Sequence, residues 1–419
     1  MRHVNRYLIV CGIALLATRS ALADGIIFDG LNARSIGRGG ANIAQNDNGA
    51  ILHDNPSAMV NIDGEGMFEL GATGLFTDLH YSDPENSNAA VSQLYAMPEF
   101  SLFKKSPGGD WAYGVGVFAP AGFGSRFYLE GPPGPLAGDQ LYKSFACLGR
   151  ILPAVAYKAT DRLSVGATLG CAVLVTDLEG PFVLQSGGLA GTPTVIDLDA
   201  GGAALTWSAG LTYLISDDTT FGLTYQNANR FKAHGTTNVE IPGLGSSNYD
   251  TRMNITFPQS LGAGIRHELC PHRIVSLDAV WYDWSSAFDD ITLRLSSPST
   301  PGFPPTTQHL PLNWRDSLSI RVGYEMKFAN YRTLRFGYVH HRSPIPANTM
   351  TPYIPAALEN AFSTGYGVRL FGWNADIAYM FSFGPTVNEG TSAIIGGDFD
   401  NSTSWDRTHA LALTLMRNW

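Results

Sequence analysis

One short stretch near the N-terminus gathers the residue types that bind metals and phosphates. It reads NDNGAILHDNPSAM, from Asn46 to Met59, and the Gly-rich phrase SIGRGGANIA at Ser35–Ala44 precedes it. Its acids and amides lack the twelve-position spacing of a calcium loop. The phrase GRGG is not the Gly-x-Gly-x-x-Gly pattern of a dinucleotide site. We therefore predict a structural turn, with a bend fixed at the step from Asn55 to Pro56.

Other reactive residues also lack a catalytic or metal-binding arrangement. His340 and His341 are neighbours in an expected strand, so their side chains point to opposite faces. The chain has no Gly-x-Ser-x-Gly motif, and no paired-cysteine metal spacing follows Cys11. Cys147 and Cys171 could meet on neighbouring strands, but we favour free thiols. We predict no enzyme, no metal and no cofactor.

The first 23 residues resemble a secretory signal peptide. Basic residues are followed by the apolar run Tyr7–Ala17 and by ALA at Ala21–Ala23. The run is too short for a spanning helix. We predict residues 1–23 as a signal peptide cleaved after Ala23; an uncleaved anchor is the alternative. The chain is acidic, with formal charge −9, which excludes nucleic acid as an electrostatically favoured partner.

From Met67 onward, apolar and polar residues alternate with period two. In Asp316–Phe328 and Trp373–Phe383, apolar side chains occupy every second position. This pattern is typical of strands with one apolar and one polar face. It predicts fourteen strands, near 67–79, 93–103, 111–120, 144–157, 163–177, 203–215, 219–232, 254–267, 273–284, 316–328, 333–341, 362–371, 373–383 and 405–419.

The connections between these strands alternate strictly between short turns and long loops. Such alternation is typical of outer-membrane barrels, whose periplasmic turns are short and extracellular loops long. A sheet in lipid must close because every backbone polar group needs a protein partner. We therefore predict an all-β membrane protein in the bacterial outer membrane: a 14-stranded antiparallel transmembrane β-barrel over residues 67–419.

Residues 24–66 lack this alternation and are too few to form a core of their own. An even number of strands places both termini in the periplasm, so this segment lies at the barrel mouth. We predict that it folds into the lumen as a small N-terminal plug, or hatch. The last strand ends on the aromatic residue Trp419, which is typical of substrates of the barrel assembly machinery. The other expected partners are outer-membrane lipids and lipopolysaccharide, around a monomer.

Several motifs resemble the outer-membrane long-chain fatty acid transporters of FadL type, including their toluene branch. They are SIGRGGANIA with HDNPSAM, WAYGVGVFAPAGFGSRF at 111–127, SPIPANT in the loop after 341, and VNEG at 387–390. The resemblance covers essentially the whole mature chain. It implies passive, energy-independent uptake of hydrophobic molecules: capture by extracellular loops, binding in the lumen against the hatch, and sideways release at a kinked third strand.

The resemblance also implies two groups of site residues. Hatch and gating candidates are Ile26, Phe28, Gly37, Arg38, Asn55 and Pro56. The candidates for the kink and lateral exit are Gly116, Phe118, Pro120, Gly122 and Phe123. The residues themselves support a kink, because proline cannot donate to a ladder and glycine weakens one. An ordinary strand end and simple plug packing are the alternatives.

A fatty acid would need a cationic partner in an apolar site. Arg321 and Arg369 face inward by alternation, and Arg315 matches a headgroup residue of the family. Alternatively, lumen arginines pair with acids such as Asp316, Glu325 and Asp376. The family's second headgroup arginine has no counterpart in VTDLEGPFV, at 175–183. This departure favours a neutral ligand, such as an aromatic hydrocarbon or an alkane.

Two non-family functions remain open. A lipid-modifying barrel enzyme would need a serine and a histidine at the lipid face, where His409 is expected. Loss of lipase activity on replacing His409 would support it. A plain aqueous porin would instead show a large ion conductance.

Overall fold

The computed structural model describes residues 25–394 and 399–419. The predicted signal peptide and its cleavage site lie outside these residues. The described helices are short: α2 (Ala33–Gly37), α3 (Ile51–Asp54), η1 (Pro56–Asn61) and η2 (Ala347–Thr349). No helix of the described part is long and apolar enough to cross a membrane.

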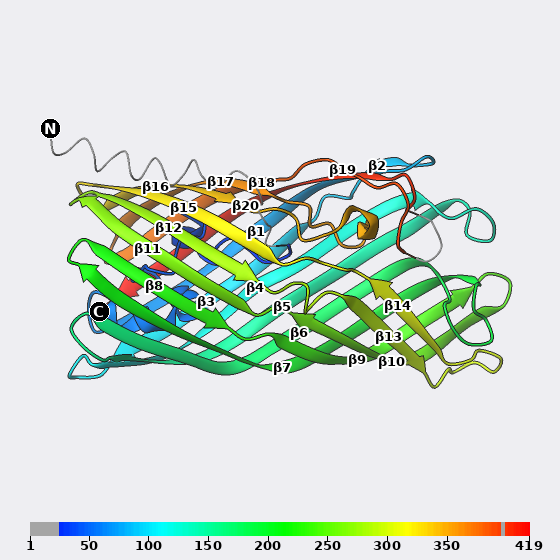
Figure 1. The fold of residues 1–419 in the computed structure, drawn as a ribbon, viewed down its shortest axis with the longest axis horizontal. Coiled ribbons are helices and arrows are strands. Elements are labelled where there is room, and N and C mark those ends of the chain that lie inside the picture. Colours follow the sequence, from blue (N-terminus) through cyan, green and yellow to red (C-terminus); the bar gives the residue numbers. More distant parts are fainter. Residues whose placement is uncertain (1–24, 395–398) are drawn as a thin grey trace.

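The rest of the chain forms a closed antiparallel barrel of fourteen strands (Figure 1). The first and last strands pair from Met67 with Asn418 to Ser82 with Thr403, which closes the sheet. Ten barrel strands are continuous: β1 (Gly66–Ser82), β3 (Leu94–Lys105), β4 (Trp111–Glu130), β5 (Asp139–Lys158), β6 (Leu163–Val183), β7 (Pro193–Ser216), β16 (Arg332–His340), β17 (Asn360–Leu370), β18 (Trp373–Phe383) and β20 (Thr403–Asn418).

The other four strands are interrupted: β8 (Thr219–Gln226) with β9 (Asn229–Ile241), β10 (Gly245–Phe257) with β11 (Ser260–Cys270), β12 (Arg273–Tyr282) with β13 (Asp290–Ser296), and β14 (Thr306–Pro311) with β15 (Ser317–Phe328). The short strands β2 (Ser87–Ala89) and β19 (Val387–Asn388) belong to loops. The short turns and Trp419 mark one end of the barrel, which we call the turn end; the opposite end is the loop end.

The fourteen predicted strands are all present, but several extend further toward the loop end than predicted. β4 continues to Glu130 and β5 begins at Asp139, so most of the loop predicted at 121–143 is a hairpin. Likewise, only three residues separate β9 from β10. The hydrophobic alternation fades here because side chains beyond the lipid need not be apolar, whereas the backbone ladder continues.

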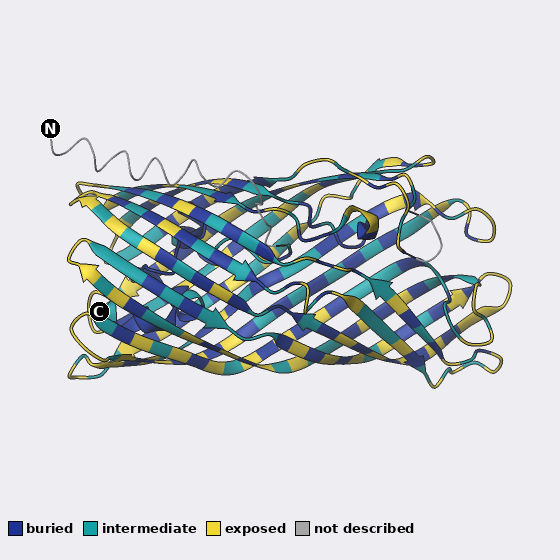
Figure 2. Ribbon diagram, viewed as in Figure 1, coloured by how far each residue is buried: buried dark blue, intermediate teal, exposed yellow. Residues whose placement is uncertain are grey.

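Along the strands, exposed apolar residues on the outer face alternate with buried residues on the inner face, as in a membrane barrel. In β20, Leu411, Leu413 and Leu415 point outward, and Leu413 is 56% exposed, whereas Ala412 and Thr414 between them are buried. Exposed and buried residues alternate in the same way along most strands (Figure 2). An outer surface of leucine, valine and aromatic side chains is stable in lipid and unfavourable in water.

Residues 25–65, which we call the N-terminal segment, lie within the lumen. Helix α2 packs on β16, β17, β18 and β20, whereas η1 packs on β5, β6 and β7 across the barrel. Glycines permit this close approach: a Cβ at Gly37 would lie 3.0 Å from Cα of Gly365, and one at Gly39 would lie 2.9 Å from the Tyr338 nitrogen. The segment therefore bridges opposite walls.

Candidate functional site

A cavity of about 280 Å³ lies in the lumen between the N-terminal segment and the loop end. Residues of β1, β3, β4, β5, β18 and β20 form its walls, and they include the exposed Leu94 of β3. Ile26, Ile27 and Phe28 form its floor, and Pro355, Ala356 and Leu358 of the loop at 342–359 form its roof. We call this space the apolar cavity.

The loop at 342–359 closes the apolar cavity because it is bonded to three separate strands. Ser125 Oγ of β4 donates to the Pro352 carbonyl at 2.6 Å. Tyr353 Oη donates to the Pro181 carbonyl of β6 at 3.2 Å. The Ala357 N–H donates to Asp406 Oδ2 of β20 at 2.8 Å. The roof is thus held from several sides.

The lining of the apolar cavity carries no Lys, Arg or His among the described residues. Its charged members are two acids, Asp29 and Asp406. Asp406 bonds the roof, and Asp29 forms an ion pair with Arg321 at 3.3 Å. The remaining lining is mainly aliphatic and aromatic, with a few hydroxyl groups. Such a space suits a neutral hydrophobic molecule.

A second cavity, of about 50 Å³, lies behind the floor and is polar. Arg150, Arg321, His53, Tyr282 and Gln226 line it. We call it the polar cavity. Ile27, Phe28 and Gly30 of the N-terminal segment and Ala121 of β4 line both cavities, so this segment and β4 form the partition between them.

Arg150 is the buried cation of the polar cavity. Its guanidinium donates to Asn229 Oδ1 at 2.8 Å, to Gln226 Oε1 at 2.6 Å and lies 3.1 Å from His53 Nε2. Burial lowers the pKa of His53, although the Asp54 carboxylate opposes this. His53 is therefore a neutral acceptor, and Arg150 is held by uncharged groups.

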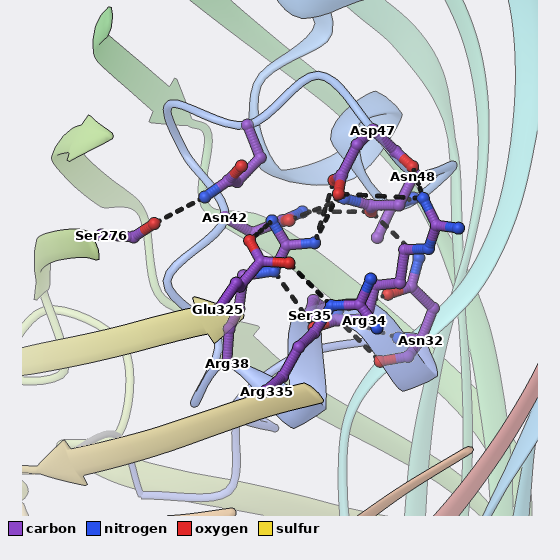
Figure 3. A network of polar contacts seen from close by, with 12 residues as sticks. Asn32, Arg34, Ser35, Arg38, Asn42, Asp47, Asn48, Ser276, Glu325 and Arg335 are labelled. Carbon is purple, nitrogen blue, oxygen red and sulfur yellow. Dashed lines mark hydrogen bonds and ion pairs between the residues drawn. The ribbon is translucent and has the colours of Figure 1, made fainter. Parts of the chain in front are cut away.

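Six charged side chains fasten the N-terminal segment to the barrel wall in a closed ring. Figure 3 labels each of them except Asp376. Arg34 of α2 contacts Asp376 of β18 at 2.9 Å, and Asp376 contacts Arg335 of β16 at 2.7 Å. Arg335 contacts Glu325 of β15 at 2.8 Å. The ring carries three positive and three negative groups, so it is neutral.

Arg38 completes this ring. It contacts Glu325 at 3.3 Å and Asp47 at 2.9 Å, and Asp47 returns to Arg34 at 3.8 Å. Burial alone would raise the pKa of Asp47, but Arg38 and Arg34 outweigh it and hold that pKa below the usual range. Asp47 is therefore ionised, which keeps the ring balanced.

The barrel wall has a gap beside the apolar cavity. The ladder between β3 and β4 ends at Phe100 with Val117, and β4 shifts register against β5 between Phe118 and Ala121. Instead of β3, the N-terminal segment pairs with β4 at this point. The Phe28 N–H donates to the Pro120 carbonyl, and the Gly122 N–H donates to the Ile26 carbonyl, both at 3.0 Å.

The structure places the hatch candidates in two groups. Ile26 and Phe28 line the apolar cavity. Gly37 and Arg38 dock α2 on the wall, at Gly365 and in the charged ring. Asn55 Nδ2 donates to the carbonyls of Ile43 at 2.9 Å and Leu211 at 3.0 Å. A Cβ at Gly166 of β6 would lie 2.7 Å from the Pro56 carbonyl carbon.

Four of the third-strand candidates follow the end of the β3–β4 ladder, whereas Gly116 lies within it, paired with Ser101. Gly122 and Phe123 line the apolar cavity, whereas Pro120 lines the polar cavity. Phe118 is buried beneath them, with its ring edge-on to His53 at 5.9 Å. A Cβ at Gly116 would overlap the Phe118 ring. Their role in ligand exit stays a prediction.

The three headgroup candidates do not come together. Arg321 lines the polar cavity and pairs with Asp29. Arg315 is exposed in the connection before β15. Arg369 is exposed at the turn end, with its guanidinium 5.2 Å from the Tyr331 ring centre. Neither Arg315 nor Arg369 lines either cavity.

Sequence reasoning did not single out Asp29, Arg34, Tyr95 or Arg150. Arg150 was hidden because alternation of β5 places it on the inner face but cannot say what lies opposite. His409, the residue of the enzyme alternative, lies 2.7 Å from the Tyr379 hydroxyl. The described residues contain no group of His, Cys, Asp and Glu side chains that could hold a metal ion. Their three cysteines are free thiols.

Comparison with known proteins agrees with this architecture. The family model described as outer membrane protein transport protein (OMPP1/FadL/TodX) matches residues 14–408. The fold is similar to the Pseudomonas putida toluene transporter TodX, with TM-score 0.78, 21% identity, and coverage of 95% of this chain and 100% of that one. No curated protein matches the chain significantly by sequence.

Two other solved structures share the fold. One is a Pseudomonas aeruginosa FadL homologue, with TM-score 0.76, 17% identity, and coverage of 94% of this chain and 99% of that one. The other is the Ralstonia pickettii toluene transporter TbuX, with TM-score 0.75, 20% identity, and coverage of 93% and 99%.

Proposed function

The chain belongs to the OMPP1/FadL/TodX family of outer-membrane transport proteins, and from that premise we propose that it admits neutral hydrophobic small molecules passively, with monoaromatic hydrocarbons and alkanes preferred over fatty acids. The observation that carries this proposal is the apolar cavity, whose described lining has two acids and no cation. A carboxylate placed there would lose its hydration without gaining a cationic partner, which is unfavourable by at least about 2 kcal/mol.

The size of the cavity supports the same ligand class. A cavity of roughly 150 Å³ is enough to bind benzene in an engineered protein. The apolar cavity, at about 280 Å³, has room for a substituted aromatic ring or a folded short alkane. Two toluene transporters share its fold.

The proposed route runs from the loop end into the apolar cavity and then sideways through the gap between β3 and β4. Two features support it: the cavity is lined by both edges of the gap, and the N-terminal segment blocks the way toward the turn end. Passage needs no energy source because the ligand moves between apolar surroundings. The N-terminal segment would act as a hatch by moving at Ile26–Phe28.

Uptake of radiolabelled toluene, hexane and palmitate by cells lacking other such channels tests this proposal. We expect toluene and hexane uptake to rise at least tenfold on expression, with a smaller change for palmitate. Ala146→Trp fills the apolar cavity and should abolish the rise. Leu169→Trp, at an exposed lipid-facing position, is the matched control and should not. Ala356→Phe narrows the same cavity from its roof, in case the first variant does not assemble.

Arg150 supports long-chain fatty acids as a second candidate ligand. It is a buried cation held by neutral groups, and Ile27, Phe28, Gly30 and Ala121 line both its cavity and the apolar one. A shift of Phe28 would let a carboxylate reach Arg150 while its tail stays in the apolar cavity. Under this alternative, Arg150→Gln should lower palmitate uptake and leave toluene uptake unchanged; equal effects on both would argue against it.

A further inference from the structure

The gap between β3 and β4 is bounded along the barrel wall. Residues Leu94–Glu99 pair with β1 on one side, but among the described residues they have no ladder partner on β4. Toward the turn end, the ladder resumes at Phe100 with Val117. Toward the loop end, the Val91 N–H donates to the Arg126 carbonyl at 2.8 Å. Between these limits the backbone leaves the wall open.

One side chain crosses this opening from edge to edge. Tyr95 starts on β3, and its ring reaches β4 at Gly124: a Cβ at Gly124 would lie 2.6 Å from Tyr95 Cζ. Beyond β4, the ring stacks on Phe145 of β5, with centroids 5.9 Å apart and planes inclined by 15°. Tyr95 is half-buried and lines the apolar cavity, so its inner face meets the space where a ligand would lie.

The contacts of Tyr95 allow it to move without disturbing the barrel. Its hydroxyl donates to Gln93 Oε1, two residues away on the same side of the gap. Within the described chain, the Tyr95 side chain forms no hydrogen bond to β4 or β5, and stacking on Phe145 holds it there. Stacking of one aromatic pair is worth only about 0.5–1.5 kcal/mol beyond burial. Rotation about χ1 would therefore uncover the opening and break no inter-strand ladder.

We propose that Tyr95 is the lid of the wall gap: its ring separates the apolar cavity from the lipid and rotates away when a molecule passes. Gly124 is the seat that lets the ring lie flat against β4. Tyr95 thereby gates the proposed sideways route, and this role rests on the proposed function. Closure of the wall gap by the Tyr95 ring can be measured without any transport.

An introduced cysteine, Ala146→Cys, provides the reporter, because Ala146 is buried on the inner face of β5 and lines the apolar cavity. Cys147 lies on the outward face of the same strand, so the three cysteines of the described chain, Cys147, Cys171 and Cys270, are replaced by serine. The protein is placed in vesicles with an apolar maleimide dissolved in the lipid. We expect Tyr95→Ala to raise the labelling rate of the introduced cysteine at least tenfold. Tyr95→Phe keeps the ring and should label at the parent rate.

Tyr113→Ala is the matched control, since Tyr113 is an exposed aromatic of β4 that lines neither cavity. It should not change the labelling rate. Gly124→Leu unseats the ring without touching Tyr95 and should accelerate labelling as Tyr95→Ala does. Equal labelling of the introduced cysteine in the parent and Tyr95→Ala proteins would overturn the lid. If labelling accelerates but no hydrocarbon is taken up by any variant, the lid stands and the proposed function fails.

Discussion

Removing the Asp376 carboxylate should release the N-terminal segment from the barrel wall. Asp376 lies between Arg34 of the segment, at 2.9 Å, and Arg335 of the wall, at 2.7 Å, and all three are largely buried. In Asp376→Asn, these two arginines face each other without the charge between them. Arg34 keeps its contacts with Asp47 of the same segment, to the carbonyl at 2.6 Å and to Oδ2 at 3.8 Å, and these do not join it to the wall.

Breaking one partner out of a buried ion pair is unfavourable by about 3–5 kcal/mol. At about 1.4 kcal/mol per decade, this changes the docking equilibrium by a factor of roughly 10² to 4 × 10³. The substitution leaves the hydrogen-bonded ladders of the barrel intact. It therefore weakens docking of the N-terminal segment and leaves assembly of the barrel unaffected. We expect Asp376→Asn to assemble normally and to show frequent ion-conducting openings in planar bilayers, where the parent protein is silent.

Two controls separate loss of the ring's balance from loss of a side chain. The double variant Glu325→Leu/Arg335→Met removes one charge of each sign and leaves the Arg34–Asp376 and Arg38–Asp47 pairs. Removing a pair together is often neutral or stabilising, so this variant should stay silent. Asp161→Asn, at an exposed turn, should also stay silent. If Asp376→Asn is silent while the balanced double variant conducts, the reasoning about the ring is refuted.

Two further predictions concern the turn at Asn55 and a loop acid. Asn55→Ala leaves the carbonyls of Ile43 and Leu211 without their amide donor, which should weaken docking of the N-terminal segment by about 1–3 kcal/mol. Uptake should change, while the folded, heat-modifiable band persists on gels. Loss of that band would instead show that Asn55 is needed for folding. Burial raises the pKa of Glu389, which accepts from Ser402, from 4.5 to about 7; the stability of its loop should be fullest below pH 4.5 and decline as pH rises through about 7. Hydrogen exchange of the loop amides should show this decline, and Glu389→Gln should remove it; an unchanged pH profile in that variant would assign the decline to another group.

The sequence alone determined the architecture because that part of the fold is local. Each strand can be predicted from its own alternation of apolar and polar residues, as with Leu411, Leu413 and Leu415 in β20. Lipid stabilises an apolar outer face in the same way for every strand of the barrel. The sequence also predicted the interruption of strand pairing at Pro120, because proline lacks the N–H donor that a β-ladder needs. The N-terminal segment stood out by lacking such a pattern.

Tertiary structure decided the site, because the lumen joins residues that are distant in sequence. Arg321 looked like a ligand-binding cation, but the segment that crosses the lumen brings Asp29 to it. Arg150 looked unremarkable, yet it lines the polar cavity while bonded to the uncharged side chains of Gln226 and Asn229. Tyr95 became a lid candidate only when the ladder between β3 and β4 was seen to end beside it. Alternation fixes which way a side chain points, whereas closure of the barrel and docking of the N-terminal segment fix what it meets.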